Sequence, residues 1–181
     1  PFVDELGLLS TRDVGFHIRL KPADGERASW RYSPSGVTAL PFVIGAGFVP
    51  FAKTIIVTEG QFDSITLASA AGWLASEASW PERIALFGTR GAGGWRTLLD
   101  AWGPHFRTDA RFVIFQDADA AGDSWKAPRG FVEALRKMGH HVRLLRPSDD
   151  GSKDITDIHR AHRLTPAIVA EWIGPTRGAT Q

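Results

Sequence analysis

Two carboxylates stand directly behind an apolar run in the segment VIFQDADAAGDSW. The run is predicted as a strand over Arg111–Phe115, and Asp117 and Asp119 follow it, two positions apart. Side chains alternate along a strand with a period of two residues, so both carboxylates project to the same side. Like charges placed this closely repel each other unless a cation lies between them. The segment therefore predicts a cation site at the end of a buried strand.

Three other short apolar runs are also followed by acidic residues or glycines. These runs are Thr54–Thr58, Arg83–Phe87 and Val142–Leu145. The residues behind them are, in order, Glu59, Gly60 and Asp63; Gly88 and Thr89; Lys153, Asp154 and Asp157. Ligands of an open parallel sheet gather beyond the carboxyl ends of its strands. We therefore expect these residues to meet at one edge of a sheet.

Stretches with helical spacing alternate with the four apolar runs. They are Asp63–Ala71, Trp95–Trp102 and Lys126–Met138, and a last helix is expected over Pro166–Ile173. This alternation predicts an α/β fold in which a parallel four-stranded sheet is flanked by helices.

A β-hairpin is predicted upstream of the sheet, from Phe16–Leu20 and Ala28–Tyr32, with a loose connection over Ser33–Pro50. One face of the hairpin would be apolar and the other basic. The apolar set is Phe16, Ile18, Leu20, Trp30 and Tyr32, and the basic set is His17, Arg19, Lys21, Arg27 and Arg31. The basic face is either an ordinary solvated surface or a guide for a phosphate backbone.

Composition excludes several classes of site. The 181 residues suffice for one domain with appendages, and the formal net charge of +1 does not by itself indicate a nucleic-acid partner. The chain has no Cys, which excludes disulfides, thiolate nucleophiles and the usual structural zinc sites. We find no apolar run long enough to span a membrane and no signal peptide, so we expect a cytoplasmic protein. The start at Pro1 suggests a piece of something longer.

The expected ion is Mg²⁺ or Mn²⁺, because the candidate ligands are all oxygens. Mg²⁺ usually completes its shell with water and substrate phosphates, which indicates phosphoryl or nucleotidyl chemistry. The segment GTRGAGGW fits neither a dinucleotide-binding motif nor a P-loop. Gly88 and Thr89 are either a phosphate-binding turn with Arg90 and Arg96 as charge partners, or a plain βα turn.

Three motifs together resemble the Toprim domain of bacterial-type primases, type IA and type II topoisomerases and several nucleases. They are IIVTEGQFDSITLA, ALFGTRGA and FQDADAAG, and the resemblance covers roughly Lys53 to Leu145. It implies a Toprim-like (Rossmann-like) domain over 53–165, preceded by the hairpin segment and connector of 1–52 and followed by the helix and flexible tail of 166–181. Topoisomerase chemistry fits poorly, because the only Tyr is Tyr32 in the hairpin.

The resemblance also implies roles for individual residues. Asp117 and Asp119 would hold one or two Mg²⁺, Glu59 would be a further ligand or handle a proton, and Asp154 would complete a second site. Lys153, Arg90 and Arg96 would face phosphate or nucleic acid. Supporting positions are Gly60, Asp63, Gly88, Thr89, Gly122 and Asp157. Trp95 and Trp125 lie nearest to this site in the sequence pattern and are candidates for stacking on a base.

The segment SKDITDI, the Ala-Gly after the paired Asp residues and the upstream hairpin resemble primases of phages and plasmids and primase-helicases. Thr156 departs from the primase pattern, which has an acid there, and the zinc-binding module is missing. The leading hypothesis is a primase or primase-helicase domain that makes RNA primers from nucleoside triphosphates on single-stranded DNA, with other domains such as a helicase as partners. A metal-dependent nuclease and a non-catalytic nucleic-acid- or nucleotide-binding module remain as alternatives.

Overall fold

The computed structural model describes residues 40–75, 81, 83–146 and 151–174, together with the backbone of four short strands nearer the N-terminus. Those strands are β1 (Phe2–Val3), β2 (Leu9–Ser10), β3 (Phe16–Leu20) and β4 (Ser29–Ser33). β3 and β4 pair antiparallel, which confirms the predicted hairpin. Their register sets Ile18 opposite Arg31 and Arg19 opposite Trp30. Opposite residues share a face, so the predicted separation into an apolar and a basic face is wrong.

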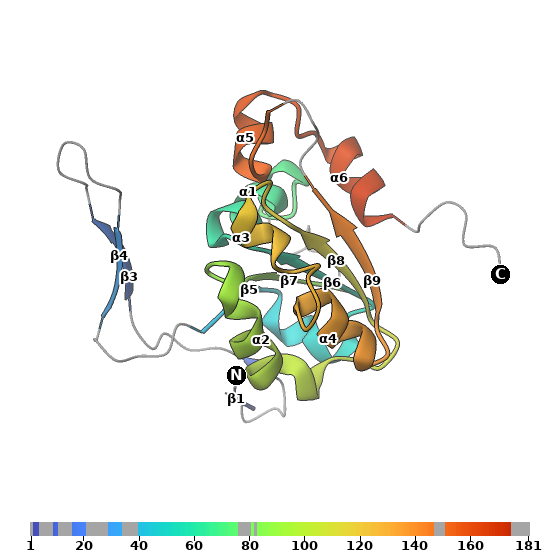
Figure 1. Ribbon diagram of the computed structural model, residues 1–181. Helices are drawn as coiled ribbons and strands as arrows, with labels where there is room; N and C mark the ends of the chain where they lie inside the picture. Colours follow the sequence, from blue (N-terminus) through green and yellow to red (C-terminus); the bar gives the residue numbers. More distant parts are fainter. Residues whose placement is uncertain are drawn as a thin grey trace.

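A five-stranded sheet with the strand order β5-β7-β6-β8-β9 forms the centre of the molecule (Figure 1). Its strands are β5 (Phe42–Ile44), β6 (Thr54–Thr58), β7 (Ile84–Gly88), β8 (Arg111–Phe115) and β9 (His141–Leu145). The four predicted strands are present and parallel, whereas β5 runs antiparallel to β7. The predicted count of four strands is therefore one too low. A three-residue strand inside a Gly- and Pro-rich segment has too few residues to show the period-2 pattern.

Helices cover both faces of the sheet. They are α1 (Gln61–Ala70), α2 (Trp95–Trp102), α3 (Ala120–Asp123), α4 (Phe131–Lys137), α5 (Ile155–Arg160) and α6 (Pro166–Ile173), with the 3-10 helices η1 (Ala46–Phe51), η3 (Ala92–Gly94) and η4 (Gly103–His105). None of the helices in the described residues is both long and apolar enough to cross a membrane.

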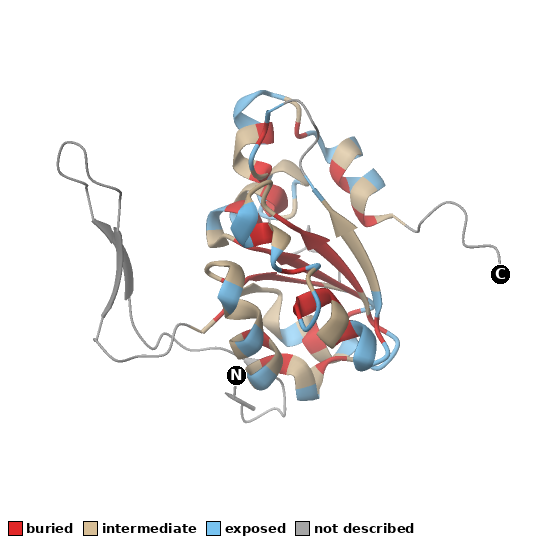
Figure 2. Ribbon diagram, viewed as in Figure 1, coloured by how far each residue is buried: buried red, intermediate tan, exposed pale blue. Residues whose placement is uncertain are grey.

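Two apolar layers separate the helices from the sheet. Ile55 and Val57 of β6 pack with η1, α2 and α4, and Ile56 packs on the opposite face with α1, α5 and α6. Every residue of β6 is buried (Figure 2). A strand covered on both faces reads as a continuous apolar run, which is why Thr54–Thr58 could be found from the sequence.

α4 begins later than the sequence indicates. The predicted helix starts at Lys126, but the helix starts at Phe131 behind Gly130. A Cβ on Gly130 would lie 2.5 Å from the carbonyl oxygen of Ser124, so this position admits only glycine in the close turn before the helix.

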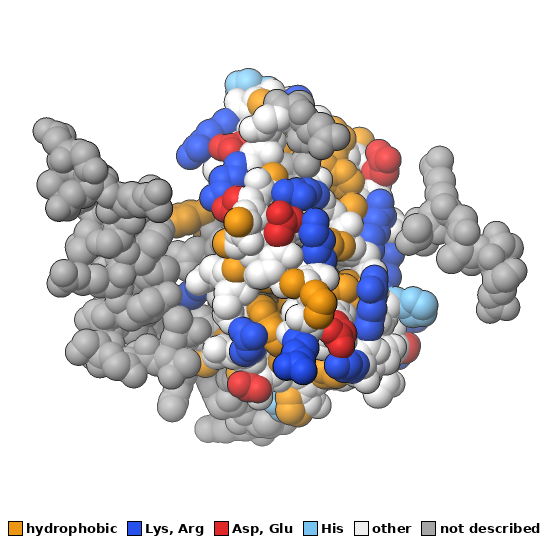
Figure 3. Space-filling model, in the orientation of Figure 1, with side chains coloured by type: hydrophobic (Ala, Val, Ile, Leu, Met, Phe, Trp, Pro, Cys, Tyr) orange, Lys and Arg blue, Asp and Glu red, His pale blue; other side chains and the backbone are white. Residues whose placement is uncertain are grey.

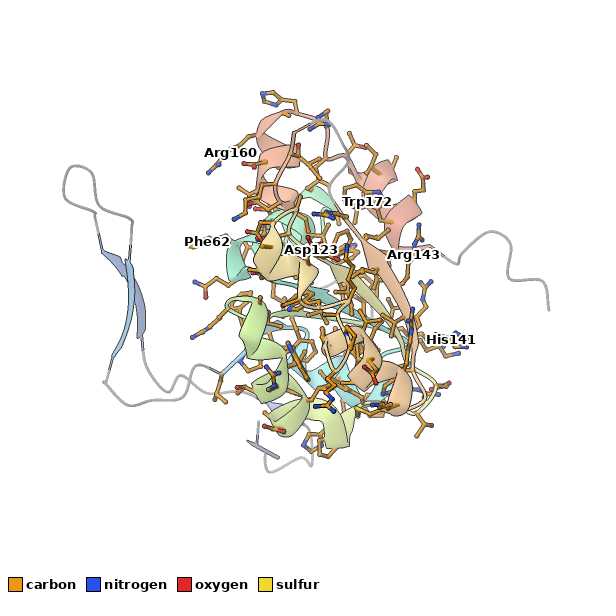
Figure 4. The ribbon with its side chains drawn as sticks, in the orientation of Figure 1. Phe62, Asp123, His141, Arg143, Arg160 and Trp172 are labelled. Carbon is orange, nitrogen blue, oxygen red and sulfur yellow. The ribbon has the colours of Figure 1, made fainter. Side chains whose placement is uncertain are left out.

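α6 is fixed to the sheet by two arginines. The Arg111 guanidinium donates to the carbonyl oxygens of Ile173 and Gly174, the latter at 2.9 Å, and to Thr54 Oγ1 at 3.0 Å. Arg143 Nη1 donates to the carbonyl oxygen of Trp172 at 2.9 Å (Figure 4). Both arginines thus satisfy carbonyls at the C-terminal end of α6, which continues the folded unit beyond residue 165. The predicted tail lies mostly in 175–181, outside the described residues.

We expect Arg111→Ala to lower the free energy of unfolding by about 2 kcal/mol, because it removes charged hydrogen bonds and leaves helix-end carbonyls without these donors. Urea unfolding measures the change. Arg107→Ala is the matched control, since the Arg107 side chain forms an exposed ion pair with Asp109 at 2.6 Å and such pairs contribute little. Equal losses in the two variants would contradict the anchoring role of Arg111.

Candidate functional site

The candidate residues lie at the carboxyl edge of the parallel strands, as predicted. Glu59 follows β6 and Asp117 lies two residues beyond β8, and these strands are neighbours in a register that sets Thr58 opposite Phe115. Asp154 begins α5 at the same end, close to α1. In Figure 1 the arrows of β8 and β9 point upward to this end, where α1, α3 and α5 lie.

The side chain of Lys153 lies between the paired carboxylates. Its Nζ is 3.1 Å from Asp119 Oδ2 and 3.8 Å from Asp117 Oδ2. The backbone fixes this arrangement, because the Ala118 N–H donates to the Lys153 carbonyl oxygen at 2.8 Å. The ammonium group thus partly neutralises the pair. The sequence analysis predicts that Lys153 faces phosphate, and it did not predict the contact of Lys153 with Asp117 and Asp119.

Glu59 and Asp117 carry strongly perturbed carboxyl groups. Burial, and then the charge of Asp119, raise the pKa of Glu59 to about 7, although Lys153 opposes the shift. Burial, and then the charge of Glu59, raise the pKa of Asp117 to about 8. Glu59 is 8% exposed, and within the described part of the chain its Oε2 has no hydrogen-bond partner. Lys153 opposes both shifts, but its charge does not outweigh burial and the neighbouring carboxylates.

Asp119 and Asp154 are both helix N-caps. Asp119 Oδ1 accepts from the Gly122 N–H at 2.9 Å, and this bond, with Lys153, lowers the pKa of Asp119. Asp154 Oδ1 accepts from the Asp157 N–H at 2.8 Å. Asp157 Oδ2 in turn accepts from the Lys153 N–H at 3.1 Å. Each cap holds a carboxylate at the strand edge while leaving its second oxygen outside the cap bond.

The residue types fit a hard divalent cation, although the side chains do not yet converge on one. Among residues 40–75, 81, 83–146 and 151–174, no group of three Asp, Glu or His side chains lies close enough to hold a metal ion. The partnerless oxygen of Glu59 and the raised pKa values of Glu59 and Asp117 mark where positive charge is lacking. Oxygen ligands in this number suit Mg²⁺ or Mn²⁺.

Asp63 joins α1 to α5. Its Oδ1 accepts from Thr156 twice, from the backbone N–H at 3.1 Å and from the hydroxyl at 2.9 Å. Burial raises the pKa of Asp63 and the Thr156 hydroxyl opposes that shift. Thr156, which departs from the primase pattern, therefore has a partner of its own. A Cβ on Gly60 would meet Asp63 Oδ2, so a side chain at this turn would need the Asp63 carboxylate to shift.

Two residues that the sequence analysis missed also hold the turn after β6. The Thr58 hydroxyl donates to the Gly60 carbonyl oxygen at 2.7 Å and lies 2.7 Å from Ser64 Oγ. The available signal was a Thr at the end of an apolar run, followed by a Ser in the next helix.

The turn after β7 uses its polar groups internally. Thr89 is 1% exposed, and its hydroxyl donates to the Gly91 carbonyl oxygen at 3.0 Å. A Cβ on Gly88 would lie 2.8 Å from Gln61 Cα, so the turn packs directly on α1. This geometry favours the plain βα turn. Arg90 has a positive φ of 60°, and the Arg96 guanidinium lies 4.3 Å from the centre of the Trp95 ring.

Trp125 is unable to stack on a base. It is fully buried, its Nε1 donates to the Ala92 carbonyl oxygen at 2.7 Å, and its ring meets the Phe131 ring edge-on at 5.4 Å. Trp95 is partly exposed but stacks on Phe131 at 5.7 Å. The prediction that Trp125 stacks on a base is therefore wrong, because the turns before α4 place its ring in the apolar core between the sheet and the helices.

A group of cations surrounds Asp123 on α3, beside the site (Figure 4). Asp123 Oδ1 lies 3.0 Å from Lys126 Nζ and 3.2 Å from Arg146 Nη1, and it accepts from Gln116 Nε2 at 2.8 Å. Figure 3 shows Lys and Arg side chains over α4 and along β9 on the same face. Charges scattered over a helix surface in this way are ordinarily solvated.

We expect Gly122→Ala to destabilise the site, because a Cβ at this position would overlap the carbonyl oxygen of Asp117. The free energy of unfolding should fall by about 2 kcal/mol, as measured by urea unfolding. Gly93→Ala is the control, since a Cβ there would have nothing within 4 Å. If both variants were as stable as the wild type, the close approach of α3 to Asp117 would be refuted.

No protein-family model, no curated protein and no solved structure matches the chain. The residues themselves must therefore carry the functional argument.

Proposed function

We propose that the chain is a Toprim-like catalytic domain of a DNA primase or primase-helicase, which joins nucleoside triphosphates into RNA primers on single-stranded DNA. One observation carries this proposal: Glu59 and Asp117, at the ends of neighbouring strands and beside Asp119, are carboxyls whose charge Lys153 compensates only in part. The three motifs in the sequence supply the choice of Toprim chemistry among metal-dependent reactions. Other domains of a longer replication protein, such as a helicase, would be its partners.

Glu59, Asp117 and Asp119 would hold Mg²⁺ or Mn²⁺, with Asp154 completing a second position. The bound ion would supply charge neutralisation at the reacting phosphate. Asp119 and Asp154 are already fixed by their cap bonds, so a ligand oxygen would be presented with little loss of side-chain entropy. In the alternative to a ligand role, Glu59 would take the proton from the attacking hydroxyl.

Lys153 would move from the carboxylates to substrate phosphate. Its ammonium group is half-exposed, with a side-chain exposure of 53%, so its flexible stem can reach outward once a divalent cation replaces it. Arg90 and Arg96 are proposed as further phosphate contacts from the neighbouring turn.

The position of Lys153 also favours a second candidate, a nucleic-acid- or nucleotide-binding module without catalysis. In that case the ammonium group would remain the permanent counter-ion of Asp117 and Asp119. The module would then bind its ligand without a divalent cation.

A single gel assay separates these functions. The protein is incubated with circular single-stranded DNA, labelled nucleoside triphosphates and Mg²⁺ or Mn²⁺, and the gel is read for new RNA and for broken DNA. We expect short labelled products that disappear with Asp119→Asn but persist with Asp100→Asn, an exposed acid on α2. Metal-dependent nicking without synthesis would instead assign a nuclease. If neither new RNA nor broken DNA appears, catalysis by this chain under these conditions is refuted, and the binding module is favoured.

A further inference from the structure

A pocket lies at the end of the parallel strands opposite the carboxylates. It has a volume of about 350 Å³ and is lined by Phe48, Phe51, Lys53, Arg83 and Arg107. This volume falls within the range of small-molecule sites. Lys53 directly precedes β6 and Arg83 directly precedes β7, so the pocket is at the amino ends of the strands. In Figure 1 this is the lower end, where the cyan segment that contains η1 lies.

Backbone hydrogen bonds hold the basic residues side by side. The Lys53 N–H donates to the Arg83 carbonyl oxygen at 3.0 Å, and the Arg111 N–H donates to the Lys53 carbonyl oxygen at 3.0 Å. The Ala110 N–H donates to the Arg107 carbonyl oxygen at 3.1 Å. The sheet pairing thus extends to Lys53 and Arg83, just before the strands, whereas Arg107 lies in the turn before β8.

The pocket carries an excess of positive charge. Arg107 is paired with Asp109 through two bonds of 2.6 and 2.8 Å, so its charge is largely compensated. Lys53 and Arg83 are both exposed, and neither has an ion-pair partner in the part of the chain that the structure describes. Lys53 also lies near enough to Asp109 to help lower the pKa of that carboxyl. The three cations precede neighbouring strands, and neighbouring strands are about 4.8 Å apart. The cations are therefore spaced too widely for one small carboxylate to contact all of them.

An exposed aromatic ring completes the pocket. Phe51, at the end of η1, is 57% exposed, and Phe48 is half-buried beside it. Phenylalanine has no polar group to satisfy in water, so an exposed ring of this kind gains from contact with another flat apolar surface. Aromatic rings next to a cationic groove are the combination that binds nucleotides of single strands, through stacking and phosphate contacts.

We propose that this pocket binds a nucleotide unit, with its base on Phe51 and its phosphates on Lys53 and Arg83. Such a unit belongs either to single-stranded nucleic acid or to a free nucleotide, and the two share this chemistry. The inference does not rest on the proposed function, because it concerns residues at the other edge of the sheet and needs no metal ion.

A binding measurement with the full 181-residue chain tests this proposal. The ligand is a fluorescein-labelled oligo-dT, and its binding is measured by fluorescence anisotropy in the presence of EDTA. At about 0.1 M salt, each phosphate contact on a single strand contributes roughly fivefold, so Lys53→Gln with Arg83→Gln should weaken binding about 20-fold. The slope of log K against log salt should decrease in magnitude by about 1.4. Phe51→Ala should weaken binding about fivefold or more without changing the slope.

The matched control is Arg136→Gln with Lys137→Gln, which removes two charges from exposed positions of α4. Wild-type affinity in the pocket double variant, or an equal loss in the α4 double variant, would overturn the proposal. ATP serves as a competitor. If ATP displaces the oligonucleotide and its own binding needs Lys53 and Arg83, the occupant is a free nucleotide, whereas failure of ATP to compete assigns a strand. Because EDTA removes the metal, a failed priming assay and a failed binding assay remain distinguishable.

Discussion

In a buffer without divalent cations, the protein is expected to lose about 2 kcal/mol of stability as the pH rises from about 6.5 to 8. Burial, and then the charge of Asp119, raise the pKa of Glu59 to about 7, and burial, and then the charge of Glu59, raise that of Asp117 to about 8. Over this pH range the folded state therefore binds more protons than the unfolded state, in which both carboxyls are already ionised. Stability falls with pH wherever the folded state holds the excess of protons. Urea unfolding in EDTA at several pH values measures the slope.

The double variant Glu59→Gln with Asp117→Asn should show no change in stability over this pH range. In the wild-type protein, added Mg²⁺ should restore the stability that is lost at pH 8. Asp100→Asn should leave the wild-type slope in place. His140 does not interfere, because burial lowers its pKa and it therefore removes stability only as the pH falls below the ordinary value of a histidine. A slope that persists in the double variant would assign the pH dependence to other groups.

On the proposed function, Asp117→Asn should lower the rate of metal-dependent nucleotide incorporation by about 10²- to 10³-fold. Asp117 lies just beyond the end of a central strand, and its negative charge is repelled by that of Glu59. A neutral amide at this position removes a metal ligand, and it also removes this repulsion. The same variant should accordingly be more stable than the wild type at pH 8 without metal. Loss of activity with a gain of stability is the signature of a site that trades stability for function.

Asp100→Asn should keep both the rate and the stability of the wild type. Initial rates on single-stranded DNA and urea unfolding of the same preparations give the two readings. If Asp117→Asn kept the wild-type rate, Asp117 would not belong to the active site. If the variant were less stable than the wild type at pH 8, the charge of Asp117 would be compensated in a way that the structure does not indicate.

The central strands and the edge at which the site lies could be predicted from the sequence. Thr54–Thr58 and Arg111–Phe115 are buried on both faces and therefore read as continuous apolar runs, and the strand bounds agree with the structure. The carboxylates behind them were located by the rule that ligands gather at the carboxyl edge of parallel strands. α2 and α6 have the predicted bounds because a clear apolar stripe or a Thr-Pro start marks them.

Features that depend on contacts between distant segments could not be predicted. β5 is too short to show a period, and its place beside β7 depends on tertiary pairing. The bond between Asp63 and Thr156 joins residues 93 positions apart, and the contact of Lys153 with Asp119 depends on where α5 begins. The burial of Trp125 depends on the turns before α4. Sequence periodicity carries no information on such contacts.

On the proposed function, the carboxylates of Glu59 and Asp117 bind a divalent cation, and that cation displaces their protons. Isothermal titration of Mg²⁺ at pH 7, in two buffers with different ionisation enthalpies, measures binding and proton release together. We expect binding with the release of between one and two protons, because at pH 7 a pKa of about 7 leaves Glu59 half protonated and a pKa of about 8 leaves Asp117 mostly protonated before the ion binds. Absence of binding, or binding that is unchanged in Glu59→Gln with Asp117→Asn, would contradict it.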